Sequence, residues 1–259
     1  MPTPITHALF TEKAEAYAQY RPEYPSELID HILHPYRSPG DISAIDVGAG
    51  TGIASRILGD RGIDVIAAEP NSAMIESAEA HPKVKYVNMS AENLEVESSS
   101  ANLVTVFQAF HWFNFKKSLQ EFNRVLEPTG QLALIWSYWD LKDPFTARYS
   151  ELIHQAASKN PGRVTPYDKF PGFIKKMRIK MLWRLRRLPY FKNIRRYRYN
   201  YVRDVSLEML IGDARSQSYI NHNGNEWEEL LENIKSLHHN NNKPQLVYSI
   251  NLFTARPNK

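Results

Sequence analysis

One short stretch has the residue types and spacing to build a ligand site from backbone. Gly48, Gly50 and Gly52 follow an apolar, strand-like run and precede a helical pattern. Glycines at alternate positions let the chain turn tightly, because they have no Cβ that could clash. A ligand can then lie against main-chain N–H groups at the start of the helix. Asp46 stands just before the first glycine, where its carboxylate can orient the turn and face a cationic or hydroxyl-bearing ligand.

A second acidic residue stands where another strand is expected to end. Residues 64–68 form an apolar run, and Glu69 and Pro70 follow it. An acid at such a strand end can accept hydrogen bonds from ribose hydroxyls, which indicates a nucleoside. Dinucleotide folds use G-x-G-x-x-G, whereas the glycines here form G-x-G-x-G and Ile53 stands at the third dinucleotide position. A tight strand-to-helix turn without a ligand is the alternative interpretation.

An aromatic segment with one histidine follows a nearly continuous run of β-formers, residues 102–107. Such a run is typical of a strand buried on both faces. Open α/β sheets bind ligands at the carboxyl ends of their strands, so His111 is expected near the ligand. Its imidazole can act as a general base, position a ligand or be a hydrogen-bonded structural residue. Trp112 beside it either lines the pocket or fills the core.

Four segments together resemble a known family. Residues 46–52 are similar to the first motif of the class I S-adenosylmethionine (SAM)-dependent methyltransferases, methyltransferase type 11 group. Residues 108–113 are similar to the segment that follows a central strand in this family. Residues 10–25 resemble the N-terminal signature of small-molecule methyltransferases related to trans-aconitate methyltransferase. Residues 215–219 resemble a further stretch of these enzymes, with serine in place of threonine.

The resemblance implies S-adenosyl-L-methionine as the cofactor and an N-terminal segment that closes over it. Met74 would lie against the adenine ring, and Ala91 and Glu92 would contact the adenine edge. The implied cofactor-binding residues are Tyr17, Arg21, Asp46, Gly48, Gly50, Gly52, Glu69, Pro70, Met74, Ala91, Glu92, Gln108 and Ala109. The substrate-side candidates are Trp112, Trp139, Arg215 and Tyr219, and His111 is the catalytic candidate.

The alternation of strand and helix patterns up to residue 136 predicts a parallel, doubly wound sheet. With the resemblance, we expect a Rossmann-like class I methyltransferase fold of seven strands with a helical cap insertion. We expect one domain over residues 1–259. Its predicted parts are an N-terminal helical lid (1–40), a SAM-binding core (41–139), the helical cap (140–190) and the C-terminal part of the sheet (191–259).

Composition excludes several classes of protein. The 259 residues contain no cysteine, so disulfides, thiolate metal sites and cysteine nucleophiles are absent. The paired His238 and His239 lack an evident third ligand, so we expect no metal. No run of about 18 apolar residues suggests a membrane span, and no secretory signal is evident, so the expected location is cytoplasmic.

The net charge of +4 hides an uneven distribution. Residues 163–203 contain 14 Lys/Arg and one acid, whereas the remainder contains 18 Lys/Arg and 27 Asp/Glu. Such a basic block suits an anionic ligand, a phosphate backbone or an anionic membrane, but it can also be a solvated face. The alternation of arginine and tyrosine over 194–201 fits nucleic-acid stacking or a half-exposed strand with its tyrosines inward.

Three functions follow as hypotheses. The first is a SAM-dependent methyltransferase that O-methylates a small anionic metabolite; the resemblance supplies the class and the basic cap suggests the anion. The second is an RNA- or membrane-associated methyltransferase that uses the basic block. The third is a nucleotide-cofactor-binding protein or oxidoreductase without methyl transfer.

Overall fold

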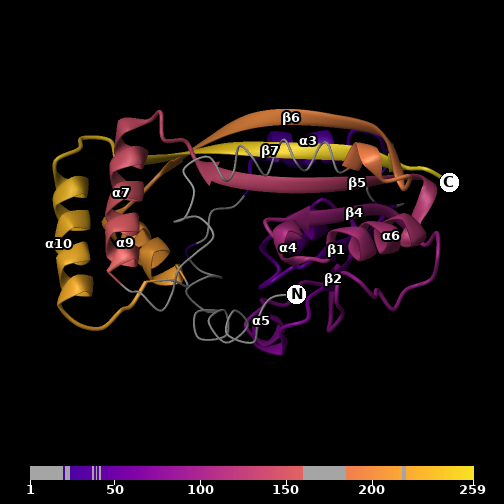
Figure 1. Ribbon diagram of the computed structural model, residues 1–259, viewed down its shortest axis with the longest axis horizontal. Coiled ribbons are helices and arrows are strands. Elements are labelled where there is room, and N and C mark those ends of the chain that lie inside the picture. The colour runs from indigo at the N-terminus through magenta and orange to yellow at the C-terminus, as the bar shows by residue number, and fades with distance from the viewer. Residues whose placement is uncertain are drawn as a thin grey trace.

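The computed structural model describes residues 20, 24–36, 38, 40, 42–159, 185–217 and 220–259. They form one seven-stranded sheet, as the sequence predicted, and its strand order is β3-β2-β1-β4-β5-β7-β6 (Figure 1). The strands are β1 Ser43–Val47, β2 Asp64–Ala68, β3 Val84–Val87, β4 Ala101–Phe107, β5 Leu126–Trp139, β6 Phe191–Asp204 and β7 Gln245–Pro257. The helices are α3 Ser26–Leu33, α4 Ile53–Asp60, α5 Ser72–Glu76, the 3-10 helix η2 Phe110–Trp112, α6 Phe115–Val125, α7 Pro144–Ser158, α9 Leu207–Ser216 and α10 Asn225–His239.

The first five strands are parallel, and β7 runs antiparallel to both of its neighbours, β5 and β6. The chain moves outward from β1 to β2 and β3, and then returns to the other side of β1 with β4. This reversal makes the carboxyl ends of β1 and β4 a topological switch point, and open α/β sheets bind ligands in a crevice at such a point. The glycine turn follows β1 and the segment with His111 follows β4, so both lie on the two sides of the expected crevice.

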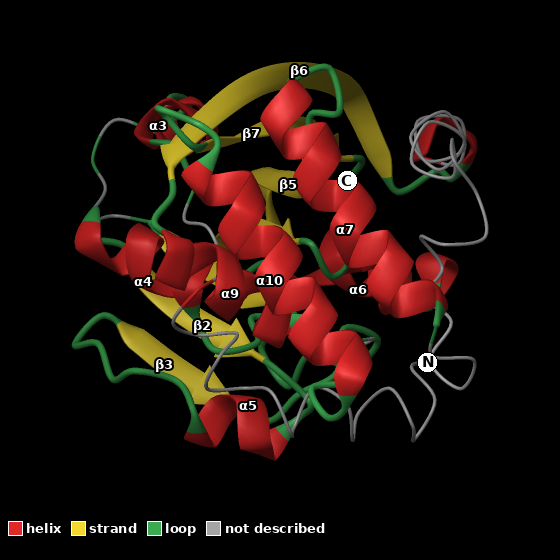
Figure 2. Ribbon diagram, turned by 90° about the vertical axis from the view of Figure 1, so that its left-hand side faces the viewer, coloured by secondary structure: helices red, strands yellow, loops and turns green. Residues whose placement is uncertain are grey.

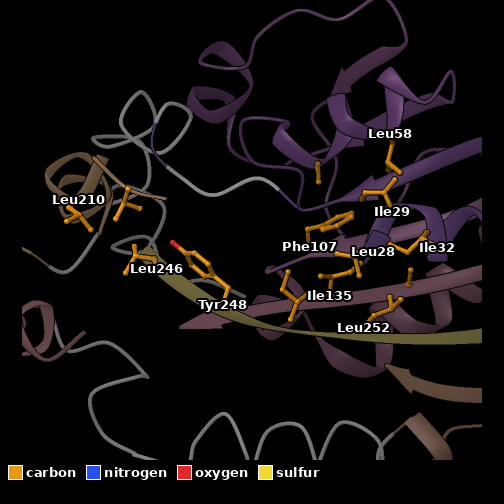
Figure 3. Packing of buried hydrophobic residues seen from close by; sticks show 14 of the residues in the cluster. Leu28, Ile29, Ile32, Leu58, Phe107, Ile135, Leu210, Leu246, Tyr248 and Leu252 are labelled. Carbon is orange, nitrogen blue, oxygen red and sulfur yellow. The ribbon is translucent and has the colours of Figure 1, made fainter. Parts of the chain in front are cut away.

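Two hydrophobic layers cover the sheet. One contains Leu28, Ile29 and Ile32 of α3 and Leu58 of α4, packed over the sheet as Figure 3 shows. On the other face, α6 contributes Leu119 and Phe122. Successive strand residues alternate between these two layers because side chains of a strand point to opposite faces. Burial of β4 on both faces explains its nearly uninterrupted run of β-formers.

Two predicted features differ from the structure. Residues 127–130, with Pro128 and Gly130, predict the end of a helix, with the next strand beginning at Gln131. In the structure β5 already begins at Leu126, which pairs with Ala101 before regular pairing resumes at Gln131. The alternating apolar residues over 246–254 predict a last strand that closes the sheet in an antiparallel hairpin. The antiparallel closing strand is present as β7, but β6 and β7 are not a direct hairpin, since α9 and α10 lie between them in sequence.

The helices α7, α9 and α10 gather beyond the end to which the β5 arrow points (Figure 1, left), and Figure 2 views the molecule from that side. Within the predicted cap, the described helix α7 packs against α10 and against β5 and β7. The division into lid, core, cap and C-terminal part stays a prediction, and most of its first part and residues 160–184 lie outside the described residues. No helix among the described residues is long and apolar enough to cross a membrane.

Candidate functional site

The three glycines of the turn have different surroundings. All three have positive φ angles: 70° at Gly48, 59° at Gly50 and 78° at Gly52. A Cβ at Gly48 would lie 2.5 Å from the Cβ of Ala109, and one at Gly52 would collide with the Tyr86 ring. A Cβ at Gly50 would meet no atom of the described residues within 4 Å. Gly48 and Gly52 thus permit close packing within the fold, whereas no described side chain packs against Gly50.

Glu69 ties the end of β2 to this turn. Its carboxylate accepts hydrogen bonds from the backbone N–H of Gly50 at 2.9 Å and of Asn71 at 3.0 Å. The side chain is 9% exposed, so these charge-assisted bonds lie largely away from water. A carboxylate has about four lone-pair positions and can therefore accept more than two hydrogen bonds. The predicted ribose-binding acid is therefore next to the open glycine.

Asp46 lies inside the fold instead of facing the crevice. Its carboxylate is 1% exposed and accepts hydrogen bonds from Ser55 Oγ at 2.6 Å and Thr105 Oγ1 at 2.9 Å. Burial raises the pKa of the Asp46 carboxyl to about 6, and the two hydroxyl donors oppose that rise. Asp46 joins β1, α4 and β4 and so supports the turn. Its direct contact with the cofactor stays a prediction.

The crevice's other side begins at a strained residue. Gln108 follows β4 with a φ of 59°, a conformation that non-glycine residues seldom adopt and that concentrates at functional sites. Its backbone N–H donates to Ile135 O at 2.9 Å and its side-chain amide donates to Ser137 O at 2.7 Å. These bonds to β5 hold the turn in place, and the next residue, Ala109, packs against Gly48.

His111 follows in the 3-10 helix η2. Its ring lies 4.7 Å from the Trp112 ring, centroid to centroid. Nδ1 is buried and has no hydrogen-bond partner among the described residues. Burial lowers the pKa of His111 to about 4, because a charged imidazole would lose its hydration. The ring is therefore neutral at pH 7 and is a weak base.

The predicted adenine contacts have mixed surroundings. Met74 of α5 and Ala91 are buried. The Glu92 carboxylate accepts a 2.6 Å hydrogen bond from the backbone N–H of Asn114, the residue before α6. Pro70 follows Glu69, and its carbonyl accepts a 3.2 Å bond from Asn88. Glu92 thus also holds the start of α6 in place.

The substrate-side residues that the structure describes come from different elements. Trp139 ends β5, with its ring 5.4 Å from that of Tyr149. The Arg215 guanidinium lies 6.0 Å from the Trp227 ring centroid and borders a cavity of about 470 Å³. The described lining of that cavity is Tyr20, Leu207, Glu208, Ile211, Gly212 and Arg215, and it includes neither His111 nor the glycine turn. Tyr17, Arg21 and Tyr219 lie outside the described residues.

Several supporting residues were not predicted. Ser55 and Thr105 hold Asp46, and Tyr86 packs against Gly52. Ser55 lies nine residues after Asp46, in the first turn of α4. A hydroxyl at that position was the sequence feature that could have predicted its hydrogen bond to Asp46. No feature of the neighbouring sequence predicts a supporting role for Thr105 or Tyr86, because only the pairing of their strands brings them to the glycine turn.

The arrangement of strands, with β7 inserted antiparallel between β5 and β6, is that of the class I methyltransferases. The fold is shared with a putative type II methyltransferase of Anaeromyxobacter dehalogenans: TM-score 0.64, 20% identity, 92% of this chain and 98% of that chain covered. A SAM-bound phosphoethanolamine N-methyltransferase 2 of Haemonchus contortus has a TM-score of 0.52 at 15% identity, with 99% of this chain and 58% of that chain covered.

Sequence comparison adds the family. Residues 45–134 match the family described as a methyltransferase domain. The match runs from the strand before the glycine turn to β5 and includes Glu69 and His111. An uncharacterised methyltransferase of Mycobacterium bovis is 32% identical over 162 residues, which are 62% of this chain and 65% of that protein. The matched region thus spans somewhat less than two thirds of that relative.

Proposed function

We propose that the protein is a SAM-dependent methyltransferase that transfers the methyl group to an oxygen of a small anionic metabolite. The observation that carries the proposal is the open backbone at Gly50 beside the Glu69 carboxylate, within a matched methyltransferase domain. The Haemonchus neighbour, which was solved with S-adenosylmethionine, supports the same cofactor. The comparisons support methyl transfer as the class of reaction. The acceptor is inferred from the chemistry of the site.

The cofactor would lie across the carboxyl ends of β1, β2 and β4. Glu69 would accept hydrogen bonds from the ribose hydroxyls while it continues to hold the turn. The backbone at Gly50 and around Gln108 would approach the methionine part of the cofactor without side chains between them. Met74 and the Ala91–Glu92 pair are the proposed adenine contacts, with Tyr17 and Arg21 contributed by the N-terminal segment.

The basicity of His111 bears on the acceptor. In an in-line transfer, an acceptor oxygen attacks the methyl carbon while the carbon–sulfur bond breaks and S-adenosylhomocysteine leaves. A hydroxyl acceptor must also lose its proton, which a base of pKa near 7 would favour. The low pKa of His111, about 4, makes it a weak base at neutral pH. A carboxylate is already ionised and becomes a methyl ester with no proton to transfer, so we propose a carboxylate acceptor.

Under this proposal, His111 is a positioning residue. Because its ring is neutral, it does not protonate the acceptor carboxylate, which must stay ionised to attack the methyl carbon. The transfer itself depends chiefly on bringing the oxygen and the methyl carbon together without water. Arg215 supplies a cation for an anionic group at the edge of its cavity. Trp112, Trp139 and Tyr219 are the proposed apolar and aromatic contacts of the acceptor.

The test uses SAM labelled in its methyl group. Purified protein is incubated with a panel of small mono-, di- and tricarboxylates and with matched alcohols of the same carbon skeletons. We expect label in base-labile methyl esters of at least one acid and none in the alcohols. Label only in alcohols would contradict the carboxylate assignment, and failure to bind S-adenosylhomocysteine would contradict the cofactor. Glu69→Ala serves as the cofactor-site control.

The structure gives less support to the RNA-associated alternative. Tyr197 and Tyr199 of β6 pack against the core layer that contains α3, with the Tyr197 ring 4.0 Å from that of His31. They are therefore not a free stacking platform for bases. On the other face of β6, Arg196 donates to Asn251 Oδ1 at 2.7 Å. Salt-dependent transfer of label to RNA or lipid would favour this alternative.

A further inference from the structure

Four side chains form one row across the strands β4, β1, β2 and β3. Asp46 of β1 pairs with Thr105 on one side and with Ala67 on the other, and Ala67 pairs with Tyr86 of β3. Residues opposite each other on neighbouring strands project from the same face of a sheet. Because Asp46 accepts a hydrogen bond from Ser55 of α4, this face is the one that lies against the start of α4.

Tyr86 supports the glycine turn from the outer end of this row. A Cβ at Gly52 would lie 2.0 Å from the Tyr86 hydroxyl oxygen and 2.5 Å from ring carbon Cε1, so this end of the ring packs against the Gly52 backbone. Ala67 lies between the two strands and has only a methyl group, which leaves room for the ring to reach the turn. The Tyr86 hydroxyl also donates to Glu79 O at 3.1 Å, which helps to fix the ring.

The same strand also holds the carboxylate of the cofactor site. The carbonyl of Val87, the residue after Tyr86, accepts a 3.0 Å hydrogen bond from the backbone N–H of Glu69. Glu69 in turn accepts the 2.9 Å bond from the N–H of Gly50. Two routes therefore connect β3 with the turn: the Val87 backbone reaches Gly50 through Glu69, and the Tyr86 ring meets Gly52 directly.

A turn with three glycines needs such support, because glycine has the widest choice of backbone conformations. Gly52 has a φ of 78° and is the residue before α4, and its N–H donates to Ala49 O at 3.0 Å. Side chains packed against a turn restrict it before a ligand arrives, so that less entropy is lost on binding. Ala109 packs in this way against Gly48, and Tyr86 packs against Gly52.

We propose that Tyr86 is a positioning residue for the amino-acid half of the cofactor. The inference rests on the proposed function, in which the backbone at Gly50 approaches the methionine part of SAM. Tyr86 is assigned no contact with SAM. Its ring holds the Gly52 end of the turn, so the backbone between Gly50 and Gly52 is kept in the conformation that receives the ligand. The ribose half depends on Glu69, whose backbone Val87 holds without the Tyr86 ring.

The experiment compares two probes by calorimetry on the full chain. S-adenosylhomocysteine has both halves, whereas methylthioadenosine has the nucleoside and lacks the amino acid. We expect Tyr86→Ala to weaken S-adenosylhomocysteine binding about tenfold and methylthioadenosine binding less than about twofold, because the loosened turn faces the amino-acid half. Tyr86→Phe keeps the ring and should bind both probes within about twofold of the unchanged protein. Lys85→Ala is the matched control, since Lys85 is the exposed neighbour on β3 and points to the opposite face.

Gly52→Ala completes a double-mutant cycle. By itself it should weaken S-adenosylhomocysteine binding at least as much as Tyr86→Ala, because its Cβ would collide with the ring and its positive φ disfavours alanine. In Gly52→Ala combined with Tyr86→Ala the ring is absent, so the two losses should be less than additive. Additive losses would show that the contact between Tyr86 and Gly52 does not carry the effect and would overturn the proposal.

The selectivity between the probes separates positioning from a general loss of structure. A poorly folded variant would lose affinity for both probes alike, so equal losses in Tyr86→Ala would overturn the proposal. Unchanged affinity of that variant for S-adenosylhomocysteine would overturn it too. If Tyr86→Ala fails to fold, Tyr86→Leu gives the same comparison and keeps an apolar side chain on the strand. Failure of the unchanged protein to bind S-adenosylhomocysteine would instead overturn the proposed function.

Discussion

At the residue scale, two carboxylates near the glycine turn have different tasks because their surroundings differ. Asp46 is enclosed and hydrogen-bonded to two hydroxyls, so it stabilises the junction of β1, α4 and β4. Glu69 lies at the surface of the crevice and accepts from two backbone N–H groups. Both stand at or just after the end of a neighbouring parallel strand. Of the two, Glu69 is the one bonded to the backbone of the glycine turn itself.

Glu69 gives the most direct test of the cofactor site. We expect Glu69→Ala to weaken S-adenosylhomocysteine binding by about 1.5–3 kcal/mol, the range for hydrogen bonds to a charged group. The variant loses the ribose contacts and also frees the N–H of Gly50. Asp64→Ala is a matched control on the same strand, since Asp64 is exposed and its carboxylate pairs with Lys83 at 3.0 Å. Equal affinities of the two variants in calorimetry would contradict the ribose assignment.

Asp46 predicts a pH dependence of stability. Its folded pKa of about 6 lies above the ordinary 3.8, so folding favours the protonated carboxyl. That contribution is fully present below pH 3.8 and is lost as the pH rises through 6. The shift corresponds to roughly 3 kcal/mol. The neutral Asp46→Asn should therefore gain stability relative to the unchanged protein between pH 4.5 and 7.5, measured by urea denaturation. A difference that is constant over this range would refute the prediction.

His111 can be tested without knowing the acceptor. With a pKa of about 4, its imidazole should show no titration between pH 5.5 and 8 in heteronuclear NMR. The exposed His239 provides an internal control in the same spectra. The lowered pKa contributes stability that is present above pH 6.5 and is lost as the pH falls through 4. A His111 midpoint near 7 would restore the general-base role, for which His111→Ala should cost about 10²–10⁴ in rate.

At the element scale, the helices beyond β5 are joined by a buried polar network. Tyr149 of α7 is fully buried, and its hydroxyl lies 2.8 Å from Leu210 O and 3.0 Å from Asp213 Oδ2 on α9. Gln217 also donates to Asp213, at 3.2 Å. The Tyr149 ring meets Trp139 at the end of β5. This network therefore connects α7, α9 and β5.

The network predicts a stability effect. We expect Tyr149→Phe to lower the free energy of unfolding by about 1–3 kcal/mol, because it removes a donor from buried acceptors without creating a large cavity. Tyr201→Phe is the control, since that side chain is only half-buried on β6. Denaturant titrations of both variants would measure the effect. A Tyr149→Phe protein as stable as the control would show that the hydroxyl contributes nothing.

At the scale of the whole molecule, the basic residues of β6 lie at the outer edge of the sheet, because β6 is the last strand in its order. Lys192, Arg195 and Arg198 are exposed there. Charged side chains on an edge strand oppose pairing with another sheet, which is a sufficient structural reason for them. The crevice at β1 and β4 is separated from this edge by β5 and β7.

This separation predicts independence of the two surfaces. We expect Arg198→Glu to leave S-adenosylhomocysteine affinity within about twofold, because water and salt screen charges beyond about 10 Å. The same variant should lower the salt at which the protein elutes from a cation-exchange column, which confirms the change in surface charge. A cofactor affinity that falls several-fold in Arg198→Glu would contradict the separation and favour a phosphate-binding role coupled to catalysis.

The sequence by itself determined the parts that depend on local pattern. Alternating strands and helices predicted the doubly wound sheet, and the glycine spacing with Glu69 at a strand end predicted the cofactor crevice. The apolar positions of β7 predicted a closing strand. These features follow from backbone preferences and from burial, both of which act over a few neighbouring residues.

Only the tertiary structure decided how those parts face one another. It left Gly50 open while Ala109 and Tyr86 pack against the other two glycines, and it turned Asp46 inward toward Thr105. It also packed the Tyr20 ring against Gly212, across 192 positions of sequence. The physical reason is that each of these outcomes is a contact between residues far apart in the chain. Such contacts arise from strand order and helix packing, which no local periodicity specifies.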